Sequence, residues 1–187
     1  MDKAACRRSC FDRIKSISAG AKRTCSQAIC DHIAASPAFN EASIIFSFIS
    51  LPSEPDLSHL SLVYPEKRWA FPKVRSGDGL AFHTVSSRDD LKPGALGLLE
   101  PDPARSELLR RDQAHLILVP GVSFDPITRA RLGRGKGYYD RFLASTLVGE
   151  KKPVFIGVCF SIQFSTIEAE PHDIPMHRLV TEQGWVN

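Results

Sequence analysis

The fold of this 187-residue chain is decided by the stretch His115-Leu-Ile-Leu-Val-Pro-Gly-Val-Ser-Phe-Asp125, followed after five residues by Arg131-Leu-Gly-Arg-Gly-Lys-Gly-Tyr-Tyr-Asp140. The run Leu116-Ile-Leu-Val119 is short, apolar and rich in branched residues, and Pro120-Gly121 stops it. This pattern is typical of a strand that is buried on both faces of a parallel sheet. Because open α/β sheets bind ligands beyond the carboxyl ends of their strands, the order predicts that the glycine-rich segment is a ligand loop at that edge.

Similar apolar runs flank this stretch and alternate with segments of helical spacing. Strands that alternate with helices indicate an α/β fold. We therefore expect a single three-layer α/β/α Rossmann-like domain, residues 1–187, with a mixed, largely parallel sheet. The expected strands are 43–50, 69–73, 80–85, 116–119, 153–160 and 178–181, and the expected helices are 3–17, 21–35, 56–63 and 138–148.

The composition is that of an ordinary globular protein, with 43% hydrophobic and 24% charged residues and a net charge of +3. Nucleic-acid binding would need a clustered basic face, so the scattered charge points to small anionic substrates instead. No apolar run has the length of a membrane span, and the N-terminus lacks the apolar core of a signal peptide. We expect a cytoplasmic protein, without nucleic-acid or membrane partners, and a monomer.

The five cysteines form no C-x-x-C motif, and their number is odd. Cys6 and Cys10 are spaced i, i+4 and could share a helix face, as a pair of metal ligands would. The other interpretation is that all five are reduced thiols in a reducing compartment.

The glycine-rich loop has the chemistry of a phosphate site. Glycine lets the backbone approach a ligand, and successive N–H groups in such a loop form a concavity that binds anions. Arg134 and Lys136 alternate with the glycines, and Asp140 supplies a carboxylate of the kind that magnesium needs near phosphates. The pattern predicts a nucleotide-phosphate cradle that opens a helix. It fits neither the P-loop nor the dinucleotide fingerprint, and a surface turn with solvated cations is the alternative.

Two segments, Pro120-Gly-Val-Ser-Phe-Asp125 and Arg131-Leu-Gly-Arg-Gly-Lys-Gly-Tyr-Tyr-Asp140, closely resemble the signature of the 5-formyltetrahydrofolate cyclo-ligase (5,10-methenyltetrahydrofolate synthetase) family. Weaker similarity extends from Lys3 to Thr181. The resemblance implies an ATP- and Mg²⁺-dependent cyclisation of 5-formyltetrahydrofolate to 5,10-methenyltetrahydrofolate, with release of ADP and phosphate. It also implies that the formyl oxygen is phosphorylated on the way.

The resemblance also implies the roles of individual residues. For ATP it implies contacts from Lys3, Arg7, Arg131, Leu132, Gly133, Arg134, Gly135, Lys136, Gly137, Tyr138 and Tyr139. For the folate it implies contacts from Ile49 and Glu54, with Arg134, Gly135, Lys136, Gly137 and Tyr138 bordering both substrates. The resemblance further implies catalytic roles for Lys136, Arg134 and Tyr138, and Mg²⁺ binding by Asp140 and Asp173.

Several of these positions have a purely structural alternative. Lys3 and Arg7, spaced i, i+4, can point at one anion or form a solvated helix face. Glu54 suits the amino-pyrimidone edge of a pterin, because a carboxylate accepts two N–H bonds, but it also suits a solvated turn. Asp173 is either a magnesium ligand or the cap of a turn, and Tyr138 either contacts ligand or packs in the core.

Three positions depart from the family pattern, namely Pro55 and Leu57 beside Glu54, and His177 where a further acidic residue is usual. Two other functions remain open from the sequence. One is a different sugar- or nucleotide-phosphate enzyme on a related α/β scaffold. The other is a non-catalytic regulator or RNA-binding domain that uses the basic loop.

Overall fold

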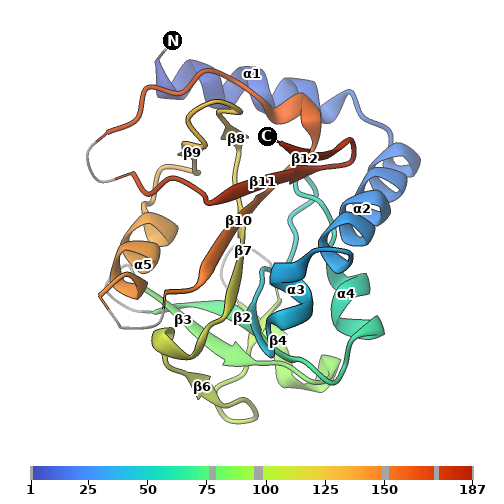
Figure 1. Ribbon diagram of the computed structural model, residues 1–187, viewed down its shortest axis with the longest axis vertical. Coiled ribbons are helices and arrows are strands. Elements are labelled where there is room, and N and C mark those ends of the chain that lie inside the picture. Colours follow the sequence, from blue (N-terminus) through green and yellow to red (C-terminus); the bar gives the residue numbers. More distant parts are fainter. Residues whose placement is uncertain (1, 76–78, 95–98, 149–151, 171–172, 187) are drawn as a thin grey trace.

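An eight-stranded mixed sheet forms the centre of the computed structural model, which describes residues 2–75, 79–94, 99–148, 152–170 and 173–186 (Figure 1). The strand order is β12-β11-β10-β7-β1-β2-β3-β6. The bounds are β12 Gly184–Val186, β11 Arg178–Thr181, β10 Val154–Val158, β7 Leu116–Pro120, β1 Ile44–Phe46, β2 Arg68–Arg75, β3 Gly79–Thr84 and β6 Leu108–Leu109. Two small hairpins accompany the sheet, β4 (Leu91–Pro93) with β5 (Leu99–Pro101), and β8 (Ser123–Phe124) with β9 (Arg131–Leu132).

The strands from β11 to β2 run parallel, whereas β12, β3 and β6 are antiparallel to the strands beside them. Strand β7 lies between β10 and β1, and every residue of Leu116–Pro120 is buried. The expected buried, central, parallel strand is therefore confirmed, and so is the mixed, largely parallel sheet.

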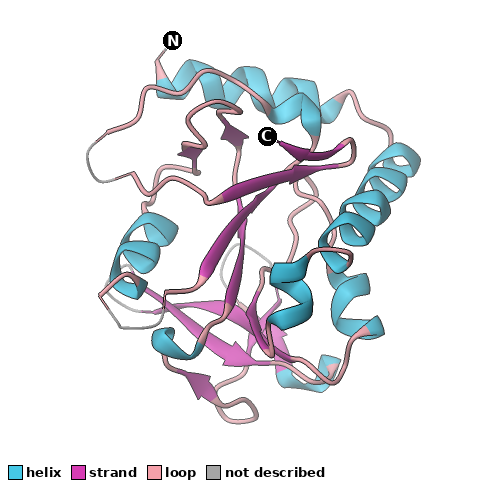
Figure 2. Ribbon diagram, in the orientation of Figure 1, coloured by secondary structure: helices cyan, strands magenta, loops and turns pink. Residues whose placement is uncertain are grey.

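Helices cover both faces of the sheet (Figure 2). Successive residues of a strand point to opposite faces, so Ile45 and Leu116 pack against the helices of one face, whereas Phe46 and Ile117 pack on the other with Phe142. The first face carries α2 (Ala19–Ala34), α3 (Pro37–Glu41) and α4 (Ser58–Val63), and the second carries α5 (Tyr138–Thr146). The expected three-layer α/β/α architecture is confirmed.

Helix α1 (Lys3–Lys15) belongs to neither layer. It lies beyond the carboxyl edge of the sheet and contacts β8 and the short 3-10 helix Ser161–Gln163. Cys10 is fully buried there, and its Sγ donates a hydrogen bond of 2.8 Å to the Val122 carbonyl. The thiols are free, and the described residues include no group of three or more metal-binding side chains.

Some elements differ from those expected. The strand expected at 43–50 is shorter and ends at Phe46. Phe48 is buried all the same, because the loop after the strand also packs into the core. Helix α3, strand β12 and the β8–β9 hairpin were not expected, since each is too short to show a periodic pattern. Within the described part of the chain, no helix has both the length and the apolar character needed to cross a membrane.

Candidate functional site

The site lies at the topological switch point of the sheet, between β1 and β7. Strands β1 and β7 are parallel neighbours, but the next parallel strand after β1 is β2 on one side, and the next after β7 is β10 on the other. The loops that leave their carboxyl ends therefore diverge and open a crevice, which is where doubly wound sheets bind ligands. One loop carries Glu54, and the other carries the glycine-rich segment.

The glycine-rich segment has the backbone that its sequence predicts. Gly135 and Gly137 adopt φ angles of 96° and 65°, a region that favours glycine. Gly137 is also the N-cap of α5, which begins at Tyr138. The prediction that the loop opens a helix is thus confirmed, and Arg134, Gly135 and Lys136 are exposed at its tip.

The first residues of the segment lie beneath the loop. Arg131 and Leu132 form β9, paired with Phe124 and Ser123, and both side chains are buried. The Arg131 guanidinium lies 2.8 Å from Asp140 Oδ1 and donates a 3.2 Å hydrogen bond to the Pro120 carbonyl. Both residues were expected to contact ATP, but their side chains face the protein interior.

Two buried polar atoms at this place have no hydrogen-bond partner among the described residues, Arg131 Nε and the Tyr139 hydroxyl. The Arg131 guanidinium lies 5.4 Å from the centre of the Tyr139 ring. Burial raises the pKa of Tyr139, and the negative charge of Glu54 adds to this effect. The phenol therefore stays protonated.

Helix α1 extends one cation to the glycine-rich loop and another to the carboxylates of Glu170 and Asp173. Arg7 Nε donates a 2.8 Å hydrogen bond to the Gly133 carbonyl. Lys3 Nζ lies 3.0 Å from carboxylate oxygens of both Glu170 and Asp173. Burial lowers the pKa of Lys3, but its hydrogen bonds and charge interactions with these two carboxylates outweigh it and leave the pKa raised. Lys3 and Arg7 are therefore both bonded to other parts of the protein, and the alternative of a purely solvated helix face does not hold; their role as ATP ligands stays a prediction.

Arg134 connects the glycine-rich loop with the loop that follows β1. Its guanidinium donates a 2.8 Å hydrogen bond to Ser53 Oγ and lies 3.6 Å from Glu54 Oε1. It also lies 5.3 Å from the centre of the Phe11 ring, a cation–π contact with α1. The two loops, far apart in the sequence, thus meet through one side chain.

Glu54 is held in a buried position. Its side chain is 8% exposed, and Oε2 accepts a 3.0 Å hydrogen bond from the Leu51 N–H. Burial raises the pKa of Glu54, although the Leu51 N–H and the Arg134 charge oppose the shift. The alternative of a solvated turn is therefore wrong for this carboxylate, because it faces the inside of the loop.

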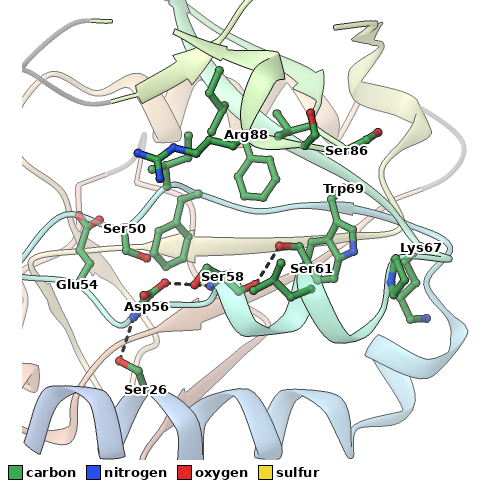
Figure 3. A pocket seen from close by; sticks show the side chains of 18 of the residues that line it. Ser26, Ser50, Glu54, Asp56, Ser58, Ser61, Lys67, Trp69, Ser86 and Arg88 are labelled. Atoms are coloured by element: carbon green, nitrogen blue, oxygen red, sulfur yellow. Dashed lines mark hydrogen bonds between the residues drawn. The ribbon is translucent and has the colours of Figure 1, made fainter. Parts of the chain in front are cut away.

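A cavity of about 1200 Å³ opens beside Glu54 (Figure 3). Its walls come from α2, α4, β2 and the segments that follow β1 and β3, and both expected folate residues, Ile49 and Glu54, line it. The sequence did not single out Trp69, Phe71 or Arg88, which also line it. Trp69 and Phe71 lie on one face of β2, where their alternation hints at a shared surface, but Arg88 lies in a separate short 3-10 helix, Arg88–Asp90.

The residues expected to hold magnesium fit that ion in chemistry. Asp140 lies in the first turn of α5, and Asp173 pairs with Lys3, so each carboxylate already lies beside a cation of the site. Magnesium takes few carboxylates together with water and phosphate oxygens, so two aspartates are a suitable donor set. His172, which precedes Asp173, lies outside the described residues.

His177 has a structural role in place of the acidic residue usual there. Its Nδ1 accepts a 2.8 Å hydrogen bond from the Phe155 N–H. Burial lowers the pKa of His177, and the charge of Arg129 adds to the shift. The neutral ring thus satisfies the backbone of β10.

Asp125 fixes the turn that leads into β9. Its Oδ1 accepts hydrogen bonds of 2.8 and 3.0 Å from the N–H groups of Ile127 and Thr128, and Oδ2 accepts one of 3.0 Å from Ile167. Burial by itself raises the pKa of Asp125, but these backbone hydrogen bonds outweigh it and hold the pKa below its ordinary value. Asp125 thus has a structural role in the turn at Asp125-Pro126.

Replacing Asp125 by Asn is therefore expected to lower the free energy of unfolding at neutral pH by about 1–3 kcal/mol, because an amide offers one acceptor oxygen where the carboxylate offers two. The stability that ionised Asp125 gives is present above the pKa of the unfolded chain and is lost as the pH falls through the lower folded-state pKa. Urea unfolding along an acid series should show the two proteins converging. Asp12→Asn, at a site 74% exposed, is the control, and a variant as stable as the wild type at neutral pH would contradict the role of Asp125.

Comparison with known proteins shows the family of the chain. The family model described as "5-formyltetrahydrofolate cyclo-ligase family" matches residues 1–182. A 5-formyltetrahydrofolate cyclo-ligase of Saccharomyces cerevisiae is 41% identical over 115 residues, which are 58% of this chain and 53% of that protein. A mitochondrial one of Arabidopsis thaliana is 33% identical over 54% of this chain and 42% of that protein. The matches thus span about half the length of these relatives.

A solved structure extends the similarity to almost the whole chain. The NMR structure of Aquifex aeolicus 5,10-methenyltetrahydrofolate synthetase is 32% identical and covers 99% of this chain and 92% of its own, with a TM-score of 0.84. Since the family model also covers all but the last few residues, this chain belongs to the 5-formyltetrahydrofolate cyclo-ligase family.

Proposed function

We propose that the protein catalyses the ATP- and Mg²⁺-dependent cyclisation of 5-formyltetrahydrofolate to 5,10-methenyltetrahydrofolate, with ADP and phosphate as the other products. The observation that carries the proposal is the contact of Arg134 with the Glu54 loop. It joins an exposed, cationic glycine loop to a buried carboxylate on the wall of a large cavity. A phosphate donor and a folate bound at these two places would have their reacting ends close together.

The chemistry needs activation because the oxygen of a formamide is a poor leaving group. The γ-phosphoryl group of ATP is transferred to that oxygen, so the bond to ADP breaks and a new oxygen–phosphorus bond forms. The second folate nitrogen then attacks the formyl carbon and loses its proton, and phosphate departs with the electron pair of the carbon–oxygen bond. The protein has to align the substrates, exclude water and stabilise phosphate charge, which are the main contributions in phosphoryl transfer.

On the ATP side, the backbone of residues 133–137 and the cations Lys3, Arg7 and Lys136 would bind the phosphates. Anions favour this place because it is the N-terminus of α5. The buried guanidinium of Arg131 would act from beneath by holding Asp140. Tyr139, whose hydroxyl is also buried, would support the loop from the same side.

On the folate side, Glu54 would accept two N–H bonds from the pterin edge, and Ile49 would contact the ring. Arg134 and Tyr138 would border both substrates, with Lys136 and Arg134 countering charge as the phosphoryl group moves. Asp140 and Asp173 would hold Mg²⁺, which would supply positive charge to the phosphates. The cytoplasmic location, the monomeric state and the single domain stay predictions.

The test is the absorbance of 5,10-methenyltetrahydrofolate after ATP is added to purified protein with 5-formyltetrahydrofolate and Mg²⁺. We expect a rise that depends on ATP and disappears with a chelator. The protein without ATP, and the protein with ATP but without the folate, are the controls. Binding of ATP by folded protein without any rise would overturn the folate assignment and favour another phosphate-transferring enzyme.

A further inference from the structure

The cavity beside Glu54 is larger than a pterin needs. Its volume of about 1200 Å³ exceeds the range of about 300–1000 Å³ that is usual for pockets of drug-sized ligands. A folate consists of a pterin, an aromatic benzoyl ring and a glutamate with two carboxylates. If the proposed function holds, the cavity has to accommodate the second and third parts as well as the first.

The wall of the cavity offers an apolar surface that suits the benzoyl ring. Phe48, Trp69 and Phe71 line it from β2 and the segment after β1, with Leu62 of α4 beside them. Trp69 is 4% exposed, so this wall is fixed by the core behind it. An aromatic ring placed against it would gain both burial and ring contacts.

The cations of the cavity wall differ in whether they are already bonded. Lys67 Nζ donates to the carbonyls of Phe39 and Ala42, at 2.9 and 2.7 Å. Arg68 pairs with Glu107 at 2.7 Å. Both side chains thus have bonds that bind them to the protein itself.

Arg23 and Arg88 are different. Both are exposed, both line the cavity, and neither guanidinium has a hydrogen bond or ion pair to any of the described residues. Arg23 lies on α2, whereas Arg88 lies in the segment that follows β3. Figure 3 shows the Arg88 side chain on the side of the cavity opposite Ser58 and Ser61, extending toward the side where Glu54 lies. An arginine fork that projects over a cavity suits a carboxylate, because it can donate two parallel N–H bonds.

The carboxylates of the cavity wall do not neutralise Arg88. Glu107 is paired with Arg68, and Glu54 lies beside Arg134. Asp56 Oδ1 accepts a 3.0 Å hydrogen bond from the Ser58 N–H on the opposite wall. Glu66 is exposed beside Lys67.

We infer that Arg88 is a specificity-determining residue that binds a carboxylate of the glutamate part of the folate. This inference rests on the proposed function and places one folate molecule in the cavity. Glu54 holds the pterin, the wall of Phe48, Trp69 and Phe71 contacts the benzoyl ring, and Arg88 meets the charged end. Arg88 touches no reacting atom, so it affects substrate affinity and not the chemical step.

The test compares 5-formyltetrahydrofolate with 5-formyltetrahydropteroate, the same molecule without its glutamate. Replacing Arg88 by Gln is expected to raise the KM for the folate about tenfold, the loss of one charge-assisted hydrogen bond, with kcat unchanged. The KM for the pteroate should be the same in both proteins. Arg88→Lys should recover part of the affinity, and Arg111→Ala, at an exposed arginine that does not line this cavity, should change neither KM.

The outcomes separate the two proposals. If the wild type shows no ATP-dependent turnover of either substrate, the proposed function itself falls. If the wild type is active and Arg88→Gln changes both KM values equally, or neither, only the assignment of Arg88 is overturned. A rise confined to the folate that weakens at high salt supports an ion pair at the glutamate.

Discussion

Replacing Lys136 by Ala is expected to lower kcat by about 10²–10³-fold, the usual effect of removing one preorganised group that stabilises transition-state charge. Lys136 is exposed at the tip of the glycine-rich loop, and the structure records no bond of its ammonium group to the described residues. Its backbone, in contrast, is held by a 3.0 Å hydrogen bond from Arg141 to the Lys136 carbonyl. The charge is therefore available to a ligand, and its loss should leave the loop in place.

The measurement is the rate of methenyltetrahydrofolate formation at saturating ATP and folate, with the melting temperature as a check on folding. Lys15→Ala is the matched control, because Lys15 is 77% exposed and pairs only weakly with Asp12 at 3.4 Å. It should retain wild-type kcat and melting temperature. A kcat of Lys136→Ala close to that of the wild type at saturating ATP would remove Lys136 from the catalytic residues.

Replacing Glu54 by Gln is expected to raise the KM for the folate by about tenfold to a hundredfold, because hydrogen bonds to a charged group contribute about 1.5–3 kcal/mol each. Gln keeps the size of the side chain and an oxygen that can accept from the Leu51 N–H. It loses the negative charge and one of the two acceptors that a pterin edge would use. The kcat at saturating folate should fall much less than the affinity.

The same Glu54→Gln substitution should not lower the stability of the protein at neutral pH, although it lowers the affinity for the folate. Burial raises the pKa of Glu54, so the folded protein binds the proton more tightly than the unfolded chain does. The ionised carboxylate then costs stability as the pH rises above its ordinary pKa, and the cost is complete above the folded-state pKa. At neutral pH we expect the melting temperature of Glu54→Gln to equal or exceed that of the wild type, and the difference to vanish in acid.

Glu107→Gln provides the control for Glu54, since Glu107 also lines the cavity but is 63% exposed and pairs with Arg68. It should leave the KM for the folate unchanged. An unchanged KM in Glu54→Gln itself would take Glu54 out of the pterin site. A higher KM together with a lower melting temperature would mean that the carboxylate serves the loop rather than the ligand.

The sequence by itself determined the elements whose physical signal is local. The apolar run of Leu116–Val119 could only be buried on both faces, and glycines at 135 and 137 permitted the positive φ angles that open α5. The spacing of Lys3 and Arg7 placed both cations on one helix face. These properties depend on neighbours in the chain, so a pattern is enough to reveal them.

Only the tertiary structure decided which groups meet. It placed Arg131 beneath the loop beside Asp140, brought Arg134 to Glu54, and gathered Trp69 and Arg88 around one cavity. Each of these arrangements joins residues from different elements of the fold. The fold buries Glu54, which raises the pKa of that carboxyl, and it leaves Arg88 exposed. No local pattern carries that information, because desolvation and charge pairing depend on what the rest of the fold places around each side chain.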